Sequence, residues 1–150
     1  MTKLIEQIRK IKNGEARMPG IGHMFGMRIT EVGEGTLTME MATDERFENA
    51  IGTLHGGVIC DLGDAAMGTA FGTTCESDES YATIELKCNF LRPVWKTTLS
   101  ARAWVVSRGK TIGLVECEVH DAGKRLIAKL SCTMTVLRGE KLKGRELRTG

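Results

Sequence analysis

Features that would mark a membrane, secreted or nucleic-acid-binding protein are missing from this sequence of 150 residues. No apolar run approaches the roughly 20 residues that a membrane-spanning helix needs. The N-terminus, MTKLIE, lacks the apolar stretch of a secretory signal peptide. The formal net charge of +2 is too small by itself to favour nucleic acid as a partner. We therefore expect a protein that binds neither membranes nor nucleic acid.

The cysteines and histidines give no sign of a disulfide framework or a metal site. The number of cysteines is odd, no CxxC pair occurs, and most lie in apolar patterns: Cys60, Cys75, Cys88, Cys117 and Cys132. Such cysteines are typical of buried free thiols in a reducing compartment, so we expect a cytoplasmic protein. No metal-ligand spacing occurs among His23, His55 and His120.

Two common catalytic motifs are also absent. No G-x-S-x-G nucleophile elbow occurs, which argues against an α/β-hydrolase. Gly109-Lys110-Thr111 resembles the end of a P-loop, but Trp104 stands where that motif needs its first glycine. A strand rather than a helix is expected after the motif, so we do not expect a nucleotide site.

What is present fits one globular domain over residues 1–150, with 41% hydrophobic and 27% charged residues. An amphipathic pattern predicts a short helix over residues 3–13, followed by a glycine-containing loop near residues 20–26. Strands are expected at 27–32 and 36–42. The basic tail from about 138 to 150 is expected to fray.

The central segment from Gly56 to about Phe71 predicts one long helix. It is apolar nearly all round, which is typical of a buried helix, and only Asp61 and Asp64 are charged. Alternating patterns then predict an antiparallel meander of four strands near 83–90, 99–105, 111–120 and 126–136. We expect an α+β fold in which an antiparallel sheet of about six strands wraps around this central helix.

The helix start and its carboxylates suggest a catalytic site. Free backbone N–H groups at Gly56-Gly57 could stabilise a developing oxyanion, with Asn49 and His55 as further donors. Asp61 and Asp64 share one face, and the repulsion between them could raise the pKa of one. Gly56 and Asp64 lie roughly 12 Å apart along a helix, too far to act on one carbonyl. A catalytic reading therefore predicts a dimer in which one copy supplies Gly56 and the other Asp64.

The residues at this point resemble a known family. His55-Gly56-Gly57, followed after four residues by Leu62-Gly63-Asp64, is similar to the signature of PaaI-like hotdog thioesterases, and Asn49 stands where that family keeps an asparagine. Phe90-Leu91-Arg92-Pro93 and the turn from Ser107 to Thr111 extend the resemblance over about residues 20–137. It implies a hotdog fold and hydrolysis of a small acyl- or aryl-CoA thioester to free acid and CoA, with no cofactor. Relatives form dimers that often pair into tetramers.

The resemblance also implies roles for matching residues. Asp64 would be the general base or the nucleophile, and the Gly56 N–H would polarise the thioester carbonyl. Asn49 would help to hold the carbonyl or the water. His55 would order the loop around the carbonyl, and Thr83 would position the water. A second group would contact substrate or CoA: Gly57, Asp61, Phe71, Arg92, Arg108, Gly109 and Lys110. Phe71 would line the acyl pocket and the three cations would meet the phosphates, although Arg108 and Lys110 are equally well explained as ordinary turn residues.

Two other functions remain open. A hotdog module could bind acyl-CoA without cleaving it, although a pure binder needs no buried carboxylate. A hotdog dehydratase for hydroxyacyl thioesters would need a histidine base deep in the site, and His55 at the helix entry is poorly placed for this. The acyl group itself is not specified by the sequence.

Overall fold

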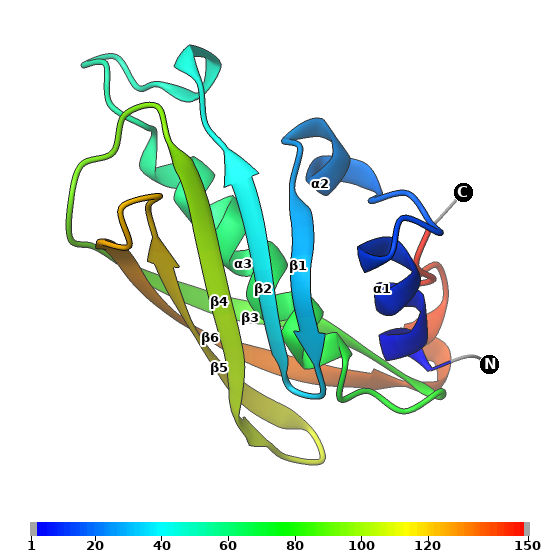
Figure 1. Ribbon diagram of the computed structural model, residues 1–150. Coiled ribbons are helices and arrows are strands. Elements are labelled where there is room, and N and C mark those ends of the chain that lie inside the picture. The colour runs from blue at the N-terminus through cyan, green and yellow to red at the C-terminus, as the bar shows by residue number, and fades with distance from the viewer. Residues whose placement is uncertain (1–2, 149–150) are drawn as a thin grey trace.

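The computed structural model, which describes residues 3–148, is a curved antiparallel sheet that holds one long helix, α3, against its inner face (Figure 1). The helices and strands have these bounds: α1 Leu4–Lys12, α2 Gly20–Met24, β1 Arg28–Gly33, β2 Thr36–Ala42, η1 Glu45–Phe47, α3 Gly56–Gly72, β3 Glu79–Phe90, β4 Thr98–Arg108, β5 Ile112–His120, β6 Leu126–Arg138 and η2 Gly139–Leu142. The six strands lie in the order β1-β2-β4-β5-β6-β3. The predicted α+β architecture, with a six-stranded sheet around a central helix, is confirmed.

The predicted meander of four strands is wrong in one connection. β3 pairs with β6 and not with β4, so only β4, β5 and β6 form a meander. The segment after β3 carries the chain past the N-terminal end of α3, where the Val94 carbonyl accepts a hydrogen bond from Leu54 N–H at 2.8 Å. Alternation along a strand fixes which side chains face the core but not which strand lies alongside. The crossover leaves β3 as an edge strand.

The core lies between α3 and the sheet. Leu62, Ala66, Met67, Ala70 and Phe71 of α3 are fully buried. The helix lies so close to the strands that a β-carbon at position 63 would stand only 2.4 Å from Leu130 Cδ2. Glycine at this position is therefore needed for the packing. All five cysteines are free thiols, as expected, and three of them are buried. Among residues 3–148, no helix is both long and apolar enough to cross a membrane.

The N-terminal region differs from the sequence prediction at its glycines. The segment expected to be a loop contains α2, a helix of five residues. Gly26, just beyond the helix, has a φ of +66°, a left-handed conformation that favours glycine and ends the helix. The glycines therefore mark the boundary of an element that is too short to show helical periodicity.

The two ends of the described chain lie side by side (Figure 1). α1 packs beside β1 and α3. After η2, the tail runs along the same region, where Arg145 Nη1 donates a hydrogen bond to the Tyr81 carbonyl at 3.5 Å. Residues from both ends therefore help to form the surroundings of α3.

Candidate active site

The N-terminal end of α3 presents an unused backbone amide. His55 is the N-cap residue, and its Nδ1 accepts a hydrogen bond from Gly57 N–H at 2.9 Å. Among residues 3–148, no acceptor is bonded to the Gly56 N–H. A β-carbon at position 56 would lie 2.9 Å from Phe90 Cζ, so glycine lets the aromatic ring lie against the helix start. The Gly56 amide can therefore donate to a ligand.

A groove of about 380 Å³ adjoins this amide. Its walls come from the segment before α3 and from the segment that follows β3: Thr53, Leu54, Gly56, Ile59, Phe90, Leu91, Arg92, Pro93 and Val94. Arg92 is exposed and forms no ion pair or side-chain hydrogen bond with any residue in the described range 3–148. The structure thus brings Arg92 and Gly56, two of the predicted residues, to one groove.

Asn49 orders the loop that leads to this end of α3. Its Oδ1 accepts from the backbone N–H of Ile51 at 3.0 Å and of Thr53 at 3.2 Å. Its Nδ2 donates to Thr53 Oγ1 at 2.8 Å. The side-chain amide therefore holds the loop, and one of its two Nδ2 protons forms no bond within the described residues.

Asp64 lies two turns farther along α3. Its Oδ1 accepts a hydrogen bond from Thr83 Oγ1 of β3 at 2.9 Å. The structure thus places Asp64 and Thr83 together, while no donor among residues 3–148 is bonded to Asp64 Oδ2. A hydroxyl that donates to one carboxylate oxygen orients the carboxylate and leaves the other oxygen to accept from water.

Neither of the two carboxylates on α3 is fully buried in the single chain. Asp64 is exposed and Asp61 is half-buried, because the helix face that carries them turns away from the sheet. Partial burial raises the pKa of Asp61, and the negative charge of Asp64 raises it further. The prediction that the pair would raise the pKa of one carboxylate therefore holds for Asp61.

The edge of the sheet beside Asp64 exposes two large apolar side chains. β3 is the edge of the sheet, and its Ile84 is 56% exposed and its Phe90 54% exposed. A long edge strand offers unpaired backbone groups to another strand, so proteins normally cover or charge such an edge. The open face of α3 and the open edge of β3 thus lie next to each other.

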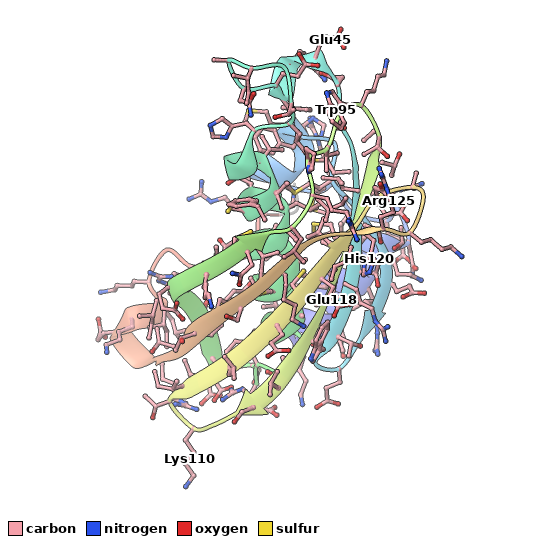
Figure 2. All side chains as sticks on the ribbon, turned by 90° about the vertical axis from the view of Figure 1, so that its left-hand side faces the viewer. Glu45, Trp95, Lys110, Glu118, His120 and Arg125 are labelled. Carbon is pink, nitrogen blue, oxygen red and sulfur yellow. The ribbon has the colours of Figure 1, made fainter. Side chains whose placement is uncertain are left out.

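The remaining predicted residues lie at the other end of α3. Phe71 is fully buried against Tyr81, with ring centroids 6.0 Å apart, and does not line a cavity beside Asp64. Arg108 Nη2 lies 2.5 Å from Glu79 Oε2, and its guanidinium stacks 5.1 Å from the Phe71 ring centroid. Gly109 N–H donates to the Ile112 carbonyl in the turn. Lys110 projects from the tip of that turn (Figure 2).

This end is therefore closed by contacts within the chain. Glu79 also pairs with Arg138, so two guanidinium groups share one carboxylate. The structure does not bring Phe71, Arg108, Gly109 and Lys110 to Gly56 or Asp64 of the same chain. Sequence reasoning identified the charged turn correctly but had no signal for Glu79, which lies 29 residues away from Arg108 in the chain.

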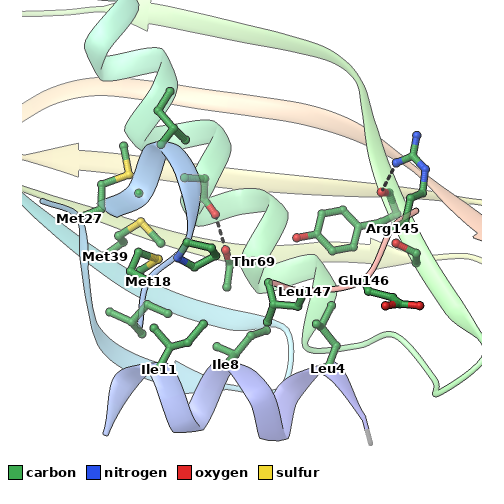
Figure 3. Close-up of a pocket in the computed structure, with 17 residues that line it drawn as sticks. Leu4, Ile8, Ile11, Met18, Met27, Met39, Thr69, Arg145, Glu146 and Leu147 are labelled. Carbon is green, nitrogen blue, oxygen red and sulfur yellow. Dashed lines mark hydrogen bonds between the residues drawn. The ribbon is translucent and has the colours of Figure 1, made fainter. Parts of the chain in front are cut away.

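Sequence reasoning also missed a second cavity, of about 400 Å³, between α1 and α3 (Figure 3). Ala65, Thr69 and Tyr81 contribute to its walls. The signal that could have indicated it is the apolar face of the N-terminal helix, since Leu4, Ile8 and Ile11 need an apolar surface to cover. Among the residues that the structure describes, no group of three His, Cys, Asp or Glu side chains is placed to hold a metal ion.

Comparison with known proteins identifies the family. Residues 51–128, just over half of the chain, match the thioesterase superfamily. The chain belongs to this superfamily. A protein of Saccharolobus solfataricus named as a candidate esterase is 31% identical over 91% of this chain and 92% of its own length. The 1,4-dihydroxy-2-naphthoyl-CoA hydrolase of Listeria monocytogenes is 25% identical over 81% of this chain and 99% of its own length.

Solved structures agree on the fold. The PaaI protein from the phenylacetic acid degradation operon of E. coli has a TM-score of 0.80 at 21% identity and covers 91% of this chain and 97% of its own. This likeness confirms the hotdog fold. The resemblance of the His55-Gly56-Gly57 segment to PaaI-like thioesterases is thereby confirmed at the level of family and fold.

Proposed function

We propose that the protein hydrolyses an acyl- or aryl-CoA thioester to the free acid and CoA, with Asp64 as general base and the Gly56 N–H of a second copy as the oxyanion donor. The observation that carries this proposal is the pair of unused groups on α3, a free amide at its start and an oriented carboxylate two turns on. Relatives named as 1,4-dihydroxy-2-naphthoyl-CoA hydrolase and acyl-coenzyme A thioesterase 13 support the substrate class.

The chemistry needs no further catalytic group. Asp64 Oδ2 accepts a proton from water, whose oxygen attacks the thioester carbonyl carbon. The resulting oxyanion accepts the hydrogen bond of the Gly56 amide at the positive end of the helix dipole. The C–S bond then breaks and CoA leaves as a thiolate, which takes up the proton. A thiol with a pKa of about 8.5 is a good leaving group, so no strong general acid is required.

A second copy is needed because of the distance between the two groups. Eight residues of helix separate Gly56 from Asp64 by roughly 12 Å. In an isologous dimer with antiparallel α3 helices, the amide of one copy would face the carboxylate of the other. The open edge of β3 beside Asp64, with the exposed side chains of Ile84 and Phe90, supports association at this face, because pairing of two β3 strands would cover the edge.

The groove beside Gly56 is the proposed binding site for the CoA part of the substrate. Arg92 stands on its wall without a carboxylate partner in the described chain, so its guanidinium can bind a phosphate. We assign Arg92 to the CoA phosphates. Lys110 lies at the other end of α3, and it would reach CoA only if another copy in a dimer or tetramer presented the phosphate to it.

The test is release of free thiol from acyl- and aryl-CoA thioesters by wild-type protein and by Asp64→Asn. The variant keeps an acceptor for Thr83 but removes the base, so kcat is expected to fall by about 10²- to 10⁴-fold. Asp78→Asn, which makes the same change at an exposed loop position, is the matched control and should keep wild-type kcat.

Three outcomes would contradict the proposal. Tight thioester binding without turnover by wild-type protein would favour the binding module. Hydration of enoyl-CoA substrates without thiol release would favour the dehydratase. Full thiol release by Asp64→Asn would remove the carboxylate from the mechanism.

A further inference from the structure

The cavity between α1 and α3, here called the α1 cavity, is lined by segments that are distant in the sequence. α1 contributes Leu4, Ile8 and Ile11, and the tail contributes Leu147 (Figure 3). Its volume of about 400 Å³ lies within the range of small-molecule pockets. Most of the side chains on its wall are apolar, so an apolar group that enters the cavity is removed from water and gains packing contacts.

The wall of the α1 cavity comes close to the candidate catalytic carboxylate at Tyr81, because the charge of Asp64 is near enough to raise the pKa of the Tyr81 hydroxyl. On α3, the wall residues are Ala65 and Thr69, which follow Asp64 in the chain. On β3, Tyr81 of the wall lies two residues before Thr83, the partner of Asp64, so both side chains are on the same face of the strand. An acyl group whose carbonyl lies at Asp64 can therefore extend past the small side chain of Ala65 into the cavity.

The interior of the α1 cavity suits an uncharged group. The Thr69 hydroxyl is already used, because it donates to the Ala65 carbonyl at 2.6 Å. Burial raises the pKa of the Tyr81 hydroxyl, so the phenol stays neutral and can donate one hydrogen bond. The charged wall residues, Arg145 and Glu146, are both exposed and of opposite sign. A carboxylate inside the cavity would lose its hydration without a buried cation to replace it.

We propose that the α1 cavity receives the acyl group of the thioester, that it selects uncharged, mainly aliphatic acyl chains several carbons long, and that α1 sets the accepted length. This inference rests on the proposed thioesterase function. Each added methylene that enters the cavity is expected to raise kcat/KM roughly fourfold until the cavity is full. Butyryl-CoA should be hydrolysed at least tenfold better, by kcat/KM, than succinyl-CoA, which has the same chain length but ends in a carboxylate.

Two variants that change the cavity in opposite directions test the proposal with acetyl-, butyryl-, hexanoyl-, octanoyl- and decanoyl-CoA. Thr69→Leu fills the cavity from α3 and should lower the ratio of kcat/KM for hexanoyl-CoA to that for acetyl-CoA at least tenfold. Ile11→Ala deepens it from α1 and should move the best substrate to a longer chain. The matched controls are Thr111→Leu and Ile112→Ala, at exposed positions of the β4–β5 turn, which should leave the wild-type profile unchanged.

The results distinguish a failure of this inference from a failure of the proposed thioesterase function. Opposite shifts by two folded variants cannot arise from a general loss of stability, which thermal unfolding would record. If Asp64-dependent hydrolysis is present but both cavity variants keep the wild-type chain-length profile, the α1 cavity is not the acyl site. Preference for succinyl- over butyryl-CoA would also overturn the inference. If wild-type protein cleaves no thioester, the proposed function fails and this inference fails with it.

Discussion

The two ends of α3, about 25 Å apart, both present an aromatic ring and an arginine, yet only one end is open. At the N-terminal end, Phe90 and Arg92 border a groove beside the unused Gly56 amide. At the C-terminal end, Phe71 is buried and Arg108 is held by Glu79. The same residue types therefore serve different purposes at the two ends.

The difference depends on partners within the chain. Glu79, only 7% exposed in its side chain, gives Arg108 a fixed place over the Phe71 ring, and a satisfied guanidinium is not available to a phosphate. Arg92 has no such carboxylate in residues 3–148 and faces solvent. An arginine near a glycine-rich helix start is thus a better indicator of a binding groove than an arginine in a turn, provided that its possible acid partners are counted.

Of the changes made at the two ends of α3, the largest effect is expected from a substitution at Gly56, at the open end. Gly56→Ala would bring a methyl group within 2.9 Å of Phe90 Cζ and push the ring or the helix start away from its present place. Displacement of an oxyanion donor costs about 10²- to 10³-fold in rate, so kcat should fall by about 100-fold. Stability should change by less than about 1 kcal/mol, because alanine is a better helix former than glycine. Thiol-release kinetics and chemical unfolding measure the two quantities.

A second change checks that steric crowding is the cause. Phe90 is exposed, so Gly56→Ala combined with Phe90→Ala should recover at least tenfold of the lost rate.

Mixing the Gly56→Ala protein with the Asp64→Asn protein tests the shared site, because in randomly formed dimers about a quarter of all sites would be intact. Activity that stays at the level of the single variants after mixing would contradict a site shared between two copies.

The next effect contrasts the two arginines. Arg108→Gln leaves Glu79 with Arg138 as its remaining ionic partner, so unfolding free energy should fall by about 2 kcal/mol while kcat/KM stays within about twofold of wild type. Arg92→Gln should do the reverse. Its stability should stay within about 0.5 kcal/mol, while KM for a CoA thioester should rise about fivefold, the value of one exposed ion pair. Denaturant titration and steady-state kinetics on both variants provide the comparison.

A larger rise in KM for Arg108→Gln than for Arg92→Gln would reverse the assignment of the two ends. It would return the Arg108-Gly109-Lys110 turn to the CoA site and require a neighbouring copy to bring that turn to Gly56.

Local patterns in the sequence were enough to predict most elements. The strand expected at 36–42 and the helix expected to begin at Gly56 occur at those positions, since period and glycine placement are local properties. The family resemblance assigned Asp64 and Thr83 to one site, with Thr83 positioning the water, but it did not predict the hydrogen bond between the two side chains. The position of β3 beside β6 was not predicted either, since register and neighbour are decided by a crossover over the end of α3.

The remaining parts of the site depend on distant side chains. Arg108 is held by an ion pair with Glu79, which also pairs with Arg138. The α1 cavity forms only where α1, α3 and the tail meet. No periodicity in any one segment carries that information. The helix was expected to be buried on all sides because its sequence is apolar, yet the face of Asp61 and Asp64 is open in the single chain.

The smallest effect is expected between the two ends, at Asp61. Its pKa is raised in the folded protein, so the folded state holds this proton more tightly than the unfolded state does. Asp61 therefore costs stability as the pH rises above 3.8, the usual pKa of an aspartate, and the cost is absent below that pH. Asp61→Asn should make the protein more stable at pH 7 by about 0.5 kcal/mol or less, as is usual for partly exposed positions. Unfolding curves should converge with wild type near pH 3. An equal gain at both pH values would mean that packing and not charge is responsible, and repulsion from Asp64 would then have no part in it.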